Sequence, residues 1–316
     1  MKIAIAAPAR KVTREEITFA VDWLHRQGIT PVYDDRLFAV DHIFAGSDAF
    51  RTAVIQEYLD RDDIDAIWLA RGGYGSIRII DRLDFSKMMQ RPKPIIGFSD
   101  GTVFHGMMNR LGIPSIHASM PYCLENKTPE SLQSLCDALM GRPLEYQWPV
   151  HPLNRFGEAE GELVGGNLSV LYGMIGSRSF PKCDGKILFL EEVDEYIYHI
   201  ERMMIGLKRA GILQNLKALI IGSLTSIHDN EDPFGRTVEQ TIFDVVSDYA
   251  YPVCFGFPAG HQPDNRALIF GQKITLQCLS GTQTARLRLK SNISQTPQGQ
   301  LHELSMGEDD EKIRGD

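Results

Sequence analysis

Ile95-Ile96-Gly97-Phe98-Ser99-Asp100-Gly101-Thr102 is the stretch of sequence around which the rest of the chain can be arranged. A short apolar run ends in glycine, a serine follows, and a helix-like segment runs from Val103 to Leu111. This order predicts a strand, a sharp turn and a helix, with the Ser99 hydroxyl close to the free amides of the helix start. The spacing Gly97-x-Ser99-x-Gly101 also fits a nucleophile elbow. Ordinary turns share this pattern, so other parts of the chain are needed to distinguish a catalytic serine from a serine in a structural turn.

The composition is that of a globular enzyme. The chain has 316 residues, of which 43% are hydrophobic and 23% charged, which allows one large domain or two medium ones. Its apolar runs are too short to cross a bilayer. The opening run, which stops at Pro8, is too short for a signal peptide and predicts a first strand instead. We therefore expect a cytoplasmic protein with no membrane partner.

Charge and cysteine usage exclude several other classes. The five cysteines are dispersed and form no C-x-x-C pair, so neither a disulfide framework nor a metal site is expected. The net charge is −8 and no basic stripe is present, which argues against nucleic acid as a partner. Six acidic and two basic residues between Glu303 and Asp316 predict a disordered tail over residues 301–316.

The first half of the chain alternates between strand and helix patterns. Strands are expected at 2–7, 31–33, 66–69 and 94–97, and helices at about 13–27, 48–60, 77–83 and 128–140. Continuously apolar strands that alternate with helices indicate an α/β fold with a parallel sheet covered on both faces. Binding and catalytic sites of such sheets lie beyond the carboxyl ends of the strands. Both Ser99 and the Gly72-Gly73 turn follow strands in this way.

Prolines and glycines between residues 142 and 161 interrupt the pattern, and we expect a linker there. It would join a domain of residues 1–141 to a second domain of residues 162–300. In this second domain we expect strands at 186–190, 216–221 and 253–257, helices at 168–175, 198–210 and 237–249, and a β-hairpin made by residues 268–271 and 273–279.

Three polar residues, each just after an apolar strand, could form a catalytic triad. A serine hydroxyl is a weak nucleophile near pH 7 and needs an imidazole to accept its proton, which in turn needs a third group to orient it. Ser99, His261 and Glu191 supply these three groups. Triads are recognised by geometry, so the order Ser, Glu, His along the chain is permitted.

Other histidines could compete for the role of base. His117 also follows a strand and is the strongest rival. His105 lies on the helix after Ser99 and should point away from the turn. His228 opens a run of acidic residues that resembles a metal site but lacks helical or strand framing.

An oxyanion hole would also be required, because the tetrahedral intermediate of acyl transfer carries negative charge. The backbone amide of Asp100 is one candidate donor. The Gly72-Gly73 turn is the other, since glycine lets a backbone approach a substrate closely. The pattern Gly73-x-Gly75 lacks the third glycine and the later acid of a dinucleotide fingerprint, so no nucleotide cofactor is expected.

Taken together, these motifs resemble the LD-carboxypeptidases of the S66 serine peptidase family. The resemblance rests on segments that occur in the family's order, namely Arg71-Gly72-Gly73-Tyr74-Gly75, Gly97-Phe98-Ser99-Asp100, Gly165-Gly166-Asn167-Leu168, Leu190-Glu191-Glu192-Val193, Glu201-Arg202-Met203, Ala210-Gly211-Ile212-Leu213 and Gly260-His261. It runs from Ile5 to about Leu276. It departs from the family at Gly101, where a larger residue is usual, and in the acidic tail.

The resemblance implies a Rossmann-like N-terminal domain, a C-terminal domain built around a β-barrel-like core with helices, and an active site between them. It implies Ser99 as nucleophile, His261 as base and Glu191 as orienter, with oxyanion donors from the Gly72-Gly73 turn and Asp100. The implied reaction releases a terminal D-alanine from murein tetrapeptides during cell-wall recycling. It needs no cofactor, and a homodimer is implied by family likeness. Two cations, Arg71 and Arg202, could bind the terminal carboxylate.

Three alternatives stay open. Relatives of the microcin-immunity type cleave adenylate-like substrates and would need an aromatic platform in the second domain, for which Trp148 is a poor candidate. An ordinary α/β-hydrolase esterase would hold all three residues on one sheet. A binding module would leave Ser99 unreactive.

Overall fold

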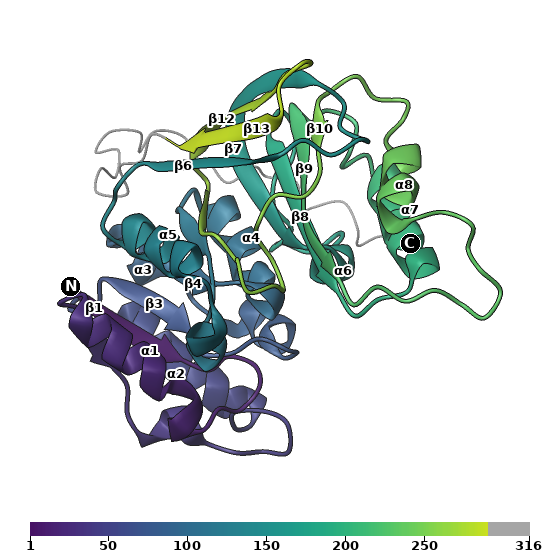
Figure 1. Ribbon diagram of the computed structural model, residues 1–316. Helices are drawn as coiled ribbons and strands as arrows, with labels where there is room; N and C mark the ends of the chain where they lie inside the picture. The colour runs from purple at the N-terminus through teal and green to yellow at the C-terminus, as the bar shows by residue number, and fades with distance from the viewer. Residues whose placement is uncertain (290–316) are drawn as a thin grey trace, which may run out of the picture.

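The computed structural model describes residues 1–289 as two lobes, each built on its own β-sheet (Figure 1). The lower lobe in Figure 1 carries most of the first half of the chain, and the upper lobe carries most of the second. The predicted α/β class is confirmed. The expected tail 301–316 and the end of the expected second domain lie outside the described residues. Within residues 1–289 no helix is both long enough and apolar enough to cross a membrane.

The N-terminal lobe has six strands in the order β11-β5-β4-β3-β1-β2. These strands are β1 (Lys2–Ala6), β2 (Thr30–Val32), β3 (Ala66–Leu69), β4 (Ile95–Gly97), β5 (Ser115–His117) and β11 (Leu268–Phe270). All neighbours pair in parallel except β11, which is antiparallel to β5. The helices are α1 (Arg14–Arg26), α2 (Asp48–Asp60), α3 (Ser86–Gln90), α4 (Thr102–Leu111) and α5 (Pro129–Leu139).

The C-terminal lobe has seven strands in the order β10-β9-β8-β7-β12-β13-β6. They are β6 (Leu144–Pro149), β7 (Gly157–Asn167), β8 (Ile187–Val193), β9 (Ala218–Thr225), β10 (Val253–Cys254), β12 (Lys273–Cys278) and β13 (Thr284–Leu289). The helices are α6 (Leu168–Gly173), α7 (Ile197–Arg209) and α8 (Val238–Val245). The two edges of this sheet approach each other, because the Trp148 indole on β6 donates to the carbonyl of Phe255 after β10, at 3.0 Å. The sheet is therefore curled, in a barrel-like way.

Strand β7 belongs to both halves of the curled sheet. Its first part pairs antiparallel with β12, and from Gly157 to Glu160 its residues alternate between half-buried and exposed. Its second part, from Leu163 to Asn167, pairs in parallel with β8 and is buried throughout. Where one face of a sheet is exposed, side-chain burial alternates along the strand, and where both faces are covered, every residue is buried. Strand β7 shows both patterns in turn.

The structure corrects three expectations. The region expected as a linker, 142–161, contains β6 and the start of β7. Pro149 ends a strand at the sheet edge, where a missing amide donor is tolerated. Residues 268–271 and 273–279 do not form a hairpin, since β11 pairs with β5 in the N-terminal lobe and β12 pairs with β7 and β13. The helix expected at 77–83 is two short 3-10 turns, Ser76–Arg78 and Ile80–Arg82, and no side chain caps the first of them.

The two lobes meet at α4 and β7. Thr102, the first residue of α4, accepts a hydrogen bond through its hydroxyl from the amide of Asn167 at 2.9 Å. Gly166 lies so close to Thr102 that a Cβ there would come within 2.7 Å of its methyl group. Further along α4, the side-chain amide of Asn109 donates a hydrogen bond to the carboxylate of Glu162 at 2.8 Å. The helix after the serine turn is thus fastened directly to the strand that precedes α6.

Candidate active site

Ser99 occupies a tight turn between β4 and α4. Its backbone φ is 58°, which is left-handed although the residue is not glycine. The turn is a short 3-10 helix, Ser99–Gly101, that leads directly into α4. Gly97 and Gly101 both approach Leu69, and a Cβ at either would lie 3.0 or 3.1 Å from its side chain. The glycines therefore allow the turn to pack against β3 while the serine projects outward.

His261 and Glu191 complete a hydrogen-bonded row with this serine. The Nε2 atom of His261 lies 3.0 Å from the Ser99 hydroxyl, and its Nδ1 atom lies 2.7 Å from a carboxylate oxygen of Glu191. Glu191 is fully buried, whereas Ser99 and His261 are partly exposed. An Nδ1–H that donates to the carboxylate leaves Nε2 free to accept the serine proton.

The loop that carries His261 belongs to the second half of the sequence but rests on the N-terminal lobe. Lys127 donates from its ammonium group to the carbonyl of Gln262 at 2.8 Å, and the amide of Thr128 donates to the carbonyl of Pro263 at 3.2 Å. Gly260, with φ of 122°, lies against Glu191, where a Cβ would come within 2.8 Å of the carboxylate. These contacts hold the imidazole between a serine of one lobe and an acid of the other.

Glu192 is as deeply buried as Glu191 but faces a different set of groups. Its carboxylate accepts hydrogen bonds from the Asn167 side chain at 2.9 Å and from the backbone amides of Ser169 and Val193 at 2.7 and 2.9 Å. A register shift in the pairing of β8 with β9 lies between Leu190 and Glu192. Burial raises the pKa of Glu192. Both neighbouring carboxylates are therefore buried, and only that of Glu191 contacts His261.

The Gly72-Gly73 turn lies beside the serine. A Cβ on Gly72 would sit 3.2 Å from the Ser99 Cβ and 3.3 Å from its hydroxyl oxygen. Within the described chain, no hydrogen bond from the amide of Gly72 or Gly73 to a protein acceptor is present. The Asp100 carboxylate accepts from the Ser76 amide at 2.9 Å and so ties this loop to the serine turn, and burial raises the pKa of Asp100. Two unpaired amides beside a serine hydroxyl suit an anionic oxygen.

Adding one methyl group at Gly72 is expected to lower kcat/KM by on the order of 10², because a shifted turn would move its amide away from the oxyanion, with an effect on the scale of one lost donor. The backbone φ of Gly72 is not in the left-handed region, so the effect should come from crowding against Met120 and Ser99, whose nearest atoms would lie 3.1 and 3.2 Å from the new Cβ, and not from backbone strain. Steady-state kinetics of Gly72→Ala test this. Gly173→Ala is the matched control, because a Cβ there meets open space. Equal kinetics for the two variants would contradict the expected crowding.

Neither predicted arginine is free within the site. The Arg71 guanidinium pairs with Glu16 at 2.8 Å and lies 4.9 Å from the ring centroid of Tyr122. Arg202 is exposed on α7, and its guanidinium lies 5.3 Å from the ring centroid of Tyr198. The structure thus does not bring Arg202 into contact with the Ser99–His261 pair.

The rival histidines do not contact the serine. His105 is buried, with Nδ1 at 2.8 Å from the Ser115 hydroxyl and Nε2 at 2.9 Å from the carbonyl of Gly97. His117 is fully buried, and within residues 1–289 neither of its ring nitrogens has a hydrogen-bond partner. His228 pairs with Asp194 at 2.7 Å. Of the four, only His261 reaches Ser99.

Burial lowers the pKa of His105 to about 4, below its ordinary value near 6.5. The folded protein therefore binds fewer protons than the unfolded chain between these two pH values, so the free energy of unfolding falls as the pH is lowered through that window. At pH 5 the expected loss from this residue is about 2 kcal/mol relative to pH 7. Urea unfolding of wild type and His105→Gln at both pH values measures it. The variant should lose less stability on acidification, and parallel losses would contradict the assignment.

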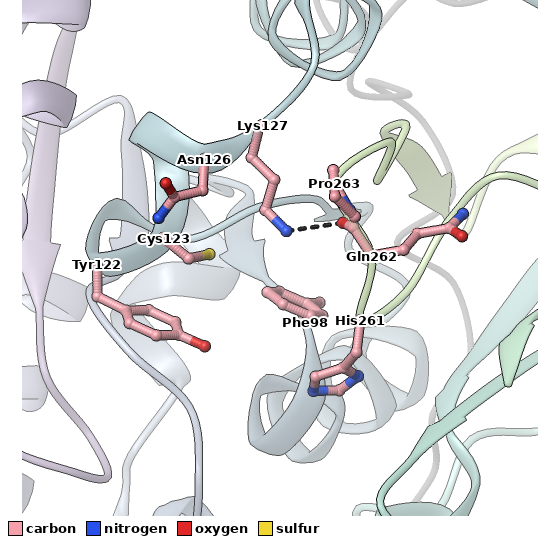
Figure 2. Close-up of a pocket in the computed structure, with 8 residues that line it drawn as sticks. All are labelled: Phe98, Tyr122, Cys123, Asn126, Lys127, His261, Gln262 and Pro263. Atoms are coloured by element: carbon pink, nitrogen blue, oxygen red, sulfur yellow. Dashed lines mark hydrogen bonds between the residues drawn. The ribbon is translucent and has the colours of Figure 1, made fainter. Parts of the chain in front are cut away.

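A cavity of about 270 Å³ opens beside His261 (Figure 2). It is lined by Phe98, Tyr122, Cys123, Asn126, Lys127, His261, Gln262 and Pro263. Among these residues, only His261 was predicted from the sequence as part of the site. The others come from the residue before Ser99, from the segment before α5 and from the His261 loop. No local motif marks them, because their proximity depends on how the two lobes pack.

Comparison with known proteins agrees with this geometry. Residues 3–118 match the family model for the LD-carboxypeptidase N-terminal domain, and residues 160–276 match the model for the C-terminal domain. A putative carboxypeptidase of Streptomyces coelicolor is 30% identical over 90% of this chain and 92% of its own length. A murein tetrapeptide carboxypeptidase of Pseudomonas aeruginosa is 28% identical over 87% of this chain and 93% of its own.

Two further similarities bear on function. The crystal structure of a muramoyltetrapeptide carboxypeptidase from Oxalobacter formigenes superposes with a TM-score of 0.83 at 28% identity, over 92% of this chain and 98% of that one. A microcin C7 self-immunity protein of Escherichia coli is 26% identical over 86% of this chain and 88% of its own length. The fold and these matches define a carboxypeptidase, which is a hydrolase. Within that class, the chain belongs to the LD-carboxypeptidase family.

Proposed function

We propose that this protein is a serine-type LD-carboxypeptidase that releases the terminal D-alanine of murein tetrapeptides in cell-wall recycling. The observation that carries the proposal is the hydrogen-bonded row of Ser99, His261 and Glu191, with 3.0 and 2.7 Å between successive groups. A family of carboxypeptidases and a relative named for murein tetrapeptide support the substrate class.

The proposed reaction begins when His261 takes the hydroxyl proton of Ser99 while the oxygen attacks the scissile carbonyl carbon. The carbonyl oxygen becomes an oxyanion, for which the amides of Gly72, Gly73 and Asp100 are the proposed donors. His261 then gives its proton to the leaving nitrogen, and D-alanine departs. A water molecule, deprotonated by the same imidazole, hydrolyses the acyl-enzyme and restores Ser99. Throughout, Glu191 holds the imidazole and stabilises its protonated form.

The test is direct. Purified protein is incubated with a murein tetrapeptide that ends in D-alanine, and mass spectrometry identifies which bond is cut. The proposal expects a tripeptide product and one equivalent of free D-alanine. Cleavage at another bond, or an intact peptide, would overturn it. We also propose a cytoplasmic homodimer, and light scattering of the purified protein measures the oligomeric state.

One observation favours a second candidate, hydrolysis of an adenylate-like substrate. Tyr196 and Tyr198 are both partly exposed at the start of α7, with ring centroids 5.6 Å apart, and they offer an aromatic surface for a base. Trp148 is buried and cannot serve in this way. This candidate is supported by the relative named for microcin self-immunity. Cleavage of an aminoacyl sulfamoyl-adenosine, with none of the tetrapeptide, would favour it.

A further inference from the structure

Any enzyme that removes one terminal residue must place that residue's carboxylate close to its nucleophile. The carboxyl carbon of the last residue is only three bonds from the scissile carbonyl carbon, a separation of a few ångströms. A cation that recognises this carboxylate therefore has to lie near Ser99 and His261. This reasoning, which rests on the function proposed above, narrows the search to cations around the cavity of Figure 2.

The arginines near the site are poorly placed for this task. Arg71 is already paired with Glu16, and its guanidinium lies against the ring of Tyr122. Arg10 is exposed and packs over Gly73, on the side of the turn where a Cβ of that glycine would lie. Arg202 lies on α7 over Tyr198. None of these three arginines lines the cavity beside His261.

Lys127 differs from the arginines in position and in pairing. Among the residues that line this cavity, Lys127 is the one lysine or arginine. It is half-buried, in the wall opposite His261. Its ammonium group donates one hydrogen bond, to the carbonyl of Gln262, and lies 5.8 Å from the ring centroid of Phe98. Within residues 1–289 no carboxylate lies within ion-pair distance of it, and two of its three donors are therefore available. Figure 2 shows the ammonium group directed into the space between Phe98 and Gln262.

We propose that Lys127 binds the terminal carboxylate of the substrate and so restricts the enzyme to the last peptide bond. The cavity of about 270 Å³ is smaller than the usual range for drug-sized ligands, roughly 300 Å³ and above, and suits a single small residue. The ring of Phe98 forms an apolar wall against which the methyl group of a terminal D-alanine could pack. Partial burial strengthens the hydrogen bond between the ammonium and a carboxylate, in which both groups are charged, whereas a neutral peptide end offers only an uncharged oxygen and gains less.

The test compares a tetrapeptide ending in free D-alanine with the same peptide ending in D-alaninamide. For Lys127→Ala, kcat/KM for the free acid is expected to fall about 10- to 100-fold, the value of one charge-assisted hydrogen bond. Hydrolysis of the peptide that ends in D-alaninamide should fall less than hydrolysis of the free acid, since that substrate carries no negative charge, so the preference for acid over amide should shrink about 10-fold or more. Any loss common to both substrates measures the contribution of the Lys127 hydrogen bond to the His261 loop. Lys127→Arg should restore part of the preference. Lys217→Ala is the matched control, because Lys217 also donates to a backbone carbonyl but does not line the cavity.

Three outcomes would overturn the proposal. Unchanged hydrolysis of both substrates by Lys127→Ala would show that Lys127 does not recognise the carboxylate. Equal losses on both substrates would show that Lys127 only positions the His261 loop through Gln262. Calorimetric binding of the two peptides to Ser99→Ala, with and without Lys127→Ala, gives a readout without turnover. A different pair of results is that the wild type releases no D-alanine while Ser99→Ala still binds the free acid more tightly than the amide, in a way that requires Lys127. That pair of results would refute the proposed function and leave the carboxylate site in place. Binding that does not distinguish the two peptides would refute the site.

Discussion

Replacing Ser99 by alanine is expected to lower kcat/KM for a D-alanine-terminated tetrapeptide by a factor on the order of 10⁴ or more. The substitution removes the oxygen that lies 3.0 Å from Nε2 of His261, and among the described residues no other serine or cysteine oxygen or sulfur is hydrogen-bonded to that nitrogen. Any residual rate would come from substrate binding and the oxyanion donors alone. Release of D-alanine, followed by mass spectrometry, measures the loss.

The fold should survive this change, so lost activity can be assigned to chemistry. Within the described chain, the Ser99 side chain makes no other hydrogen bond. The midpoint of thermal unfolding of Ser99→Ala should therefore differ from that of the wild type by only a few degrees. Ser177→Ala serves as the control, because its hydroxyl contacts Ser179 and lies in the other half of the sequence. Turnover of the tetrapeptide by Ser99→Ala at the wild-type rate would end the assignment of Ser99 as nucleophile.

Local signals in the sequence predicted most of the N-terminal lobe. The helix expected at about 13–27 is α1, which begins with a capping box formed by Thr13 and Glu16, and the apolar run 66–69 is the buried strand β3. The turn at Ser99 was predictable for the same reason, since Gly97 and Gly101 let it pack tightly against the neighbouring strand. Each of these features is decided by residues close to one another in the chain.

The features that sequence could not supply depend on contacts between distant segments. The runs 268–271 and 273–279 have the spacing of a hairpin, but β11 finds its partner in β5, which lies about 150 residues earlier in the chain. Burial of Glu192 depends on Asn167, and the position of Lys127 in the site depends on the loop that carries His261. A hydrophobic pattern of period two predicts a strand but does not predict which strand it pairs with. Pairing and site composition were therefore beyond local reasoning.

Glu191→Gln is expected to lower kcat by about 10³- to 10⁴-fold while the protein stays folded. In the wild type the carboxylate, 2.7 Å from Nδ1 of His261, can only accept, which keeps the proton on Nδ1 and leaves Nε2 unprotonated, as the proposed role of base requires. An amide donor at that position favours the opposite tautomer, whose Nε2–H cannot take the Ser99 proton. Replacing a buried carboxylate by a neutral group of the same shape also removes a desolvation cost, so stability should change little.

The adjacent residue provides a control of the same chemistry and burial. Glu192→Gln replaces a carboxylate that accepts from Asn167, Ser169 and Val193 and makes no contact with His261. An amide nitrogen cannot accept all of these donors, so a loss of about 1–3 kcal/mol in unfolding free energy is expected. Its kcat should stay within about tenfold of wild type. The two variants thus have opposite expected profiles, one catalytic and one structural. If Glu191→Gln kept its rate while Glu192→Gln lost its own, the orienting role would belong to Glu192 instead.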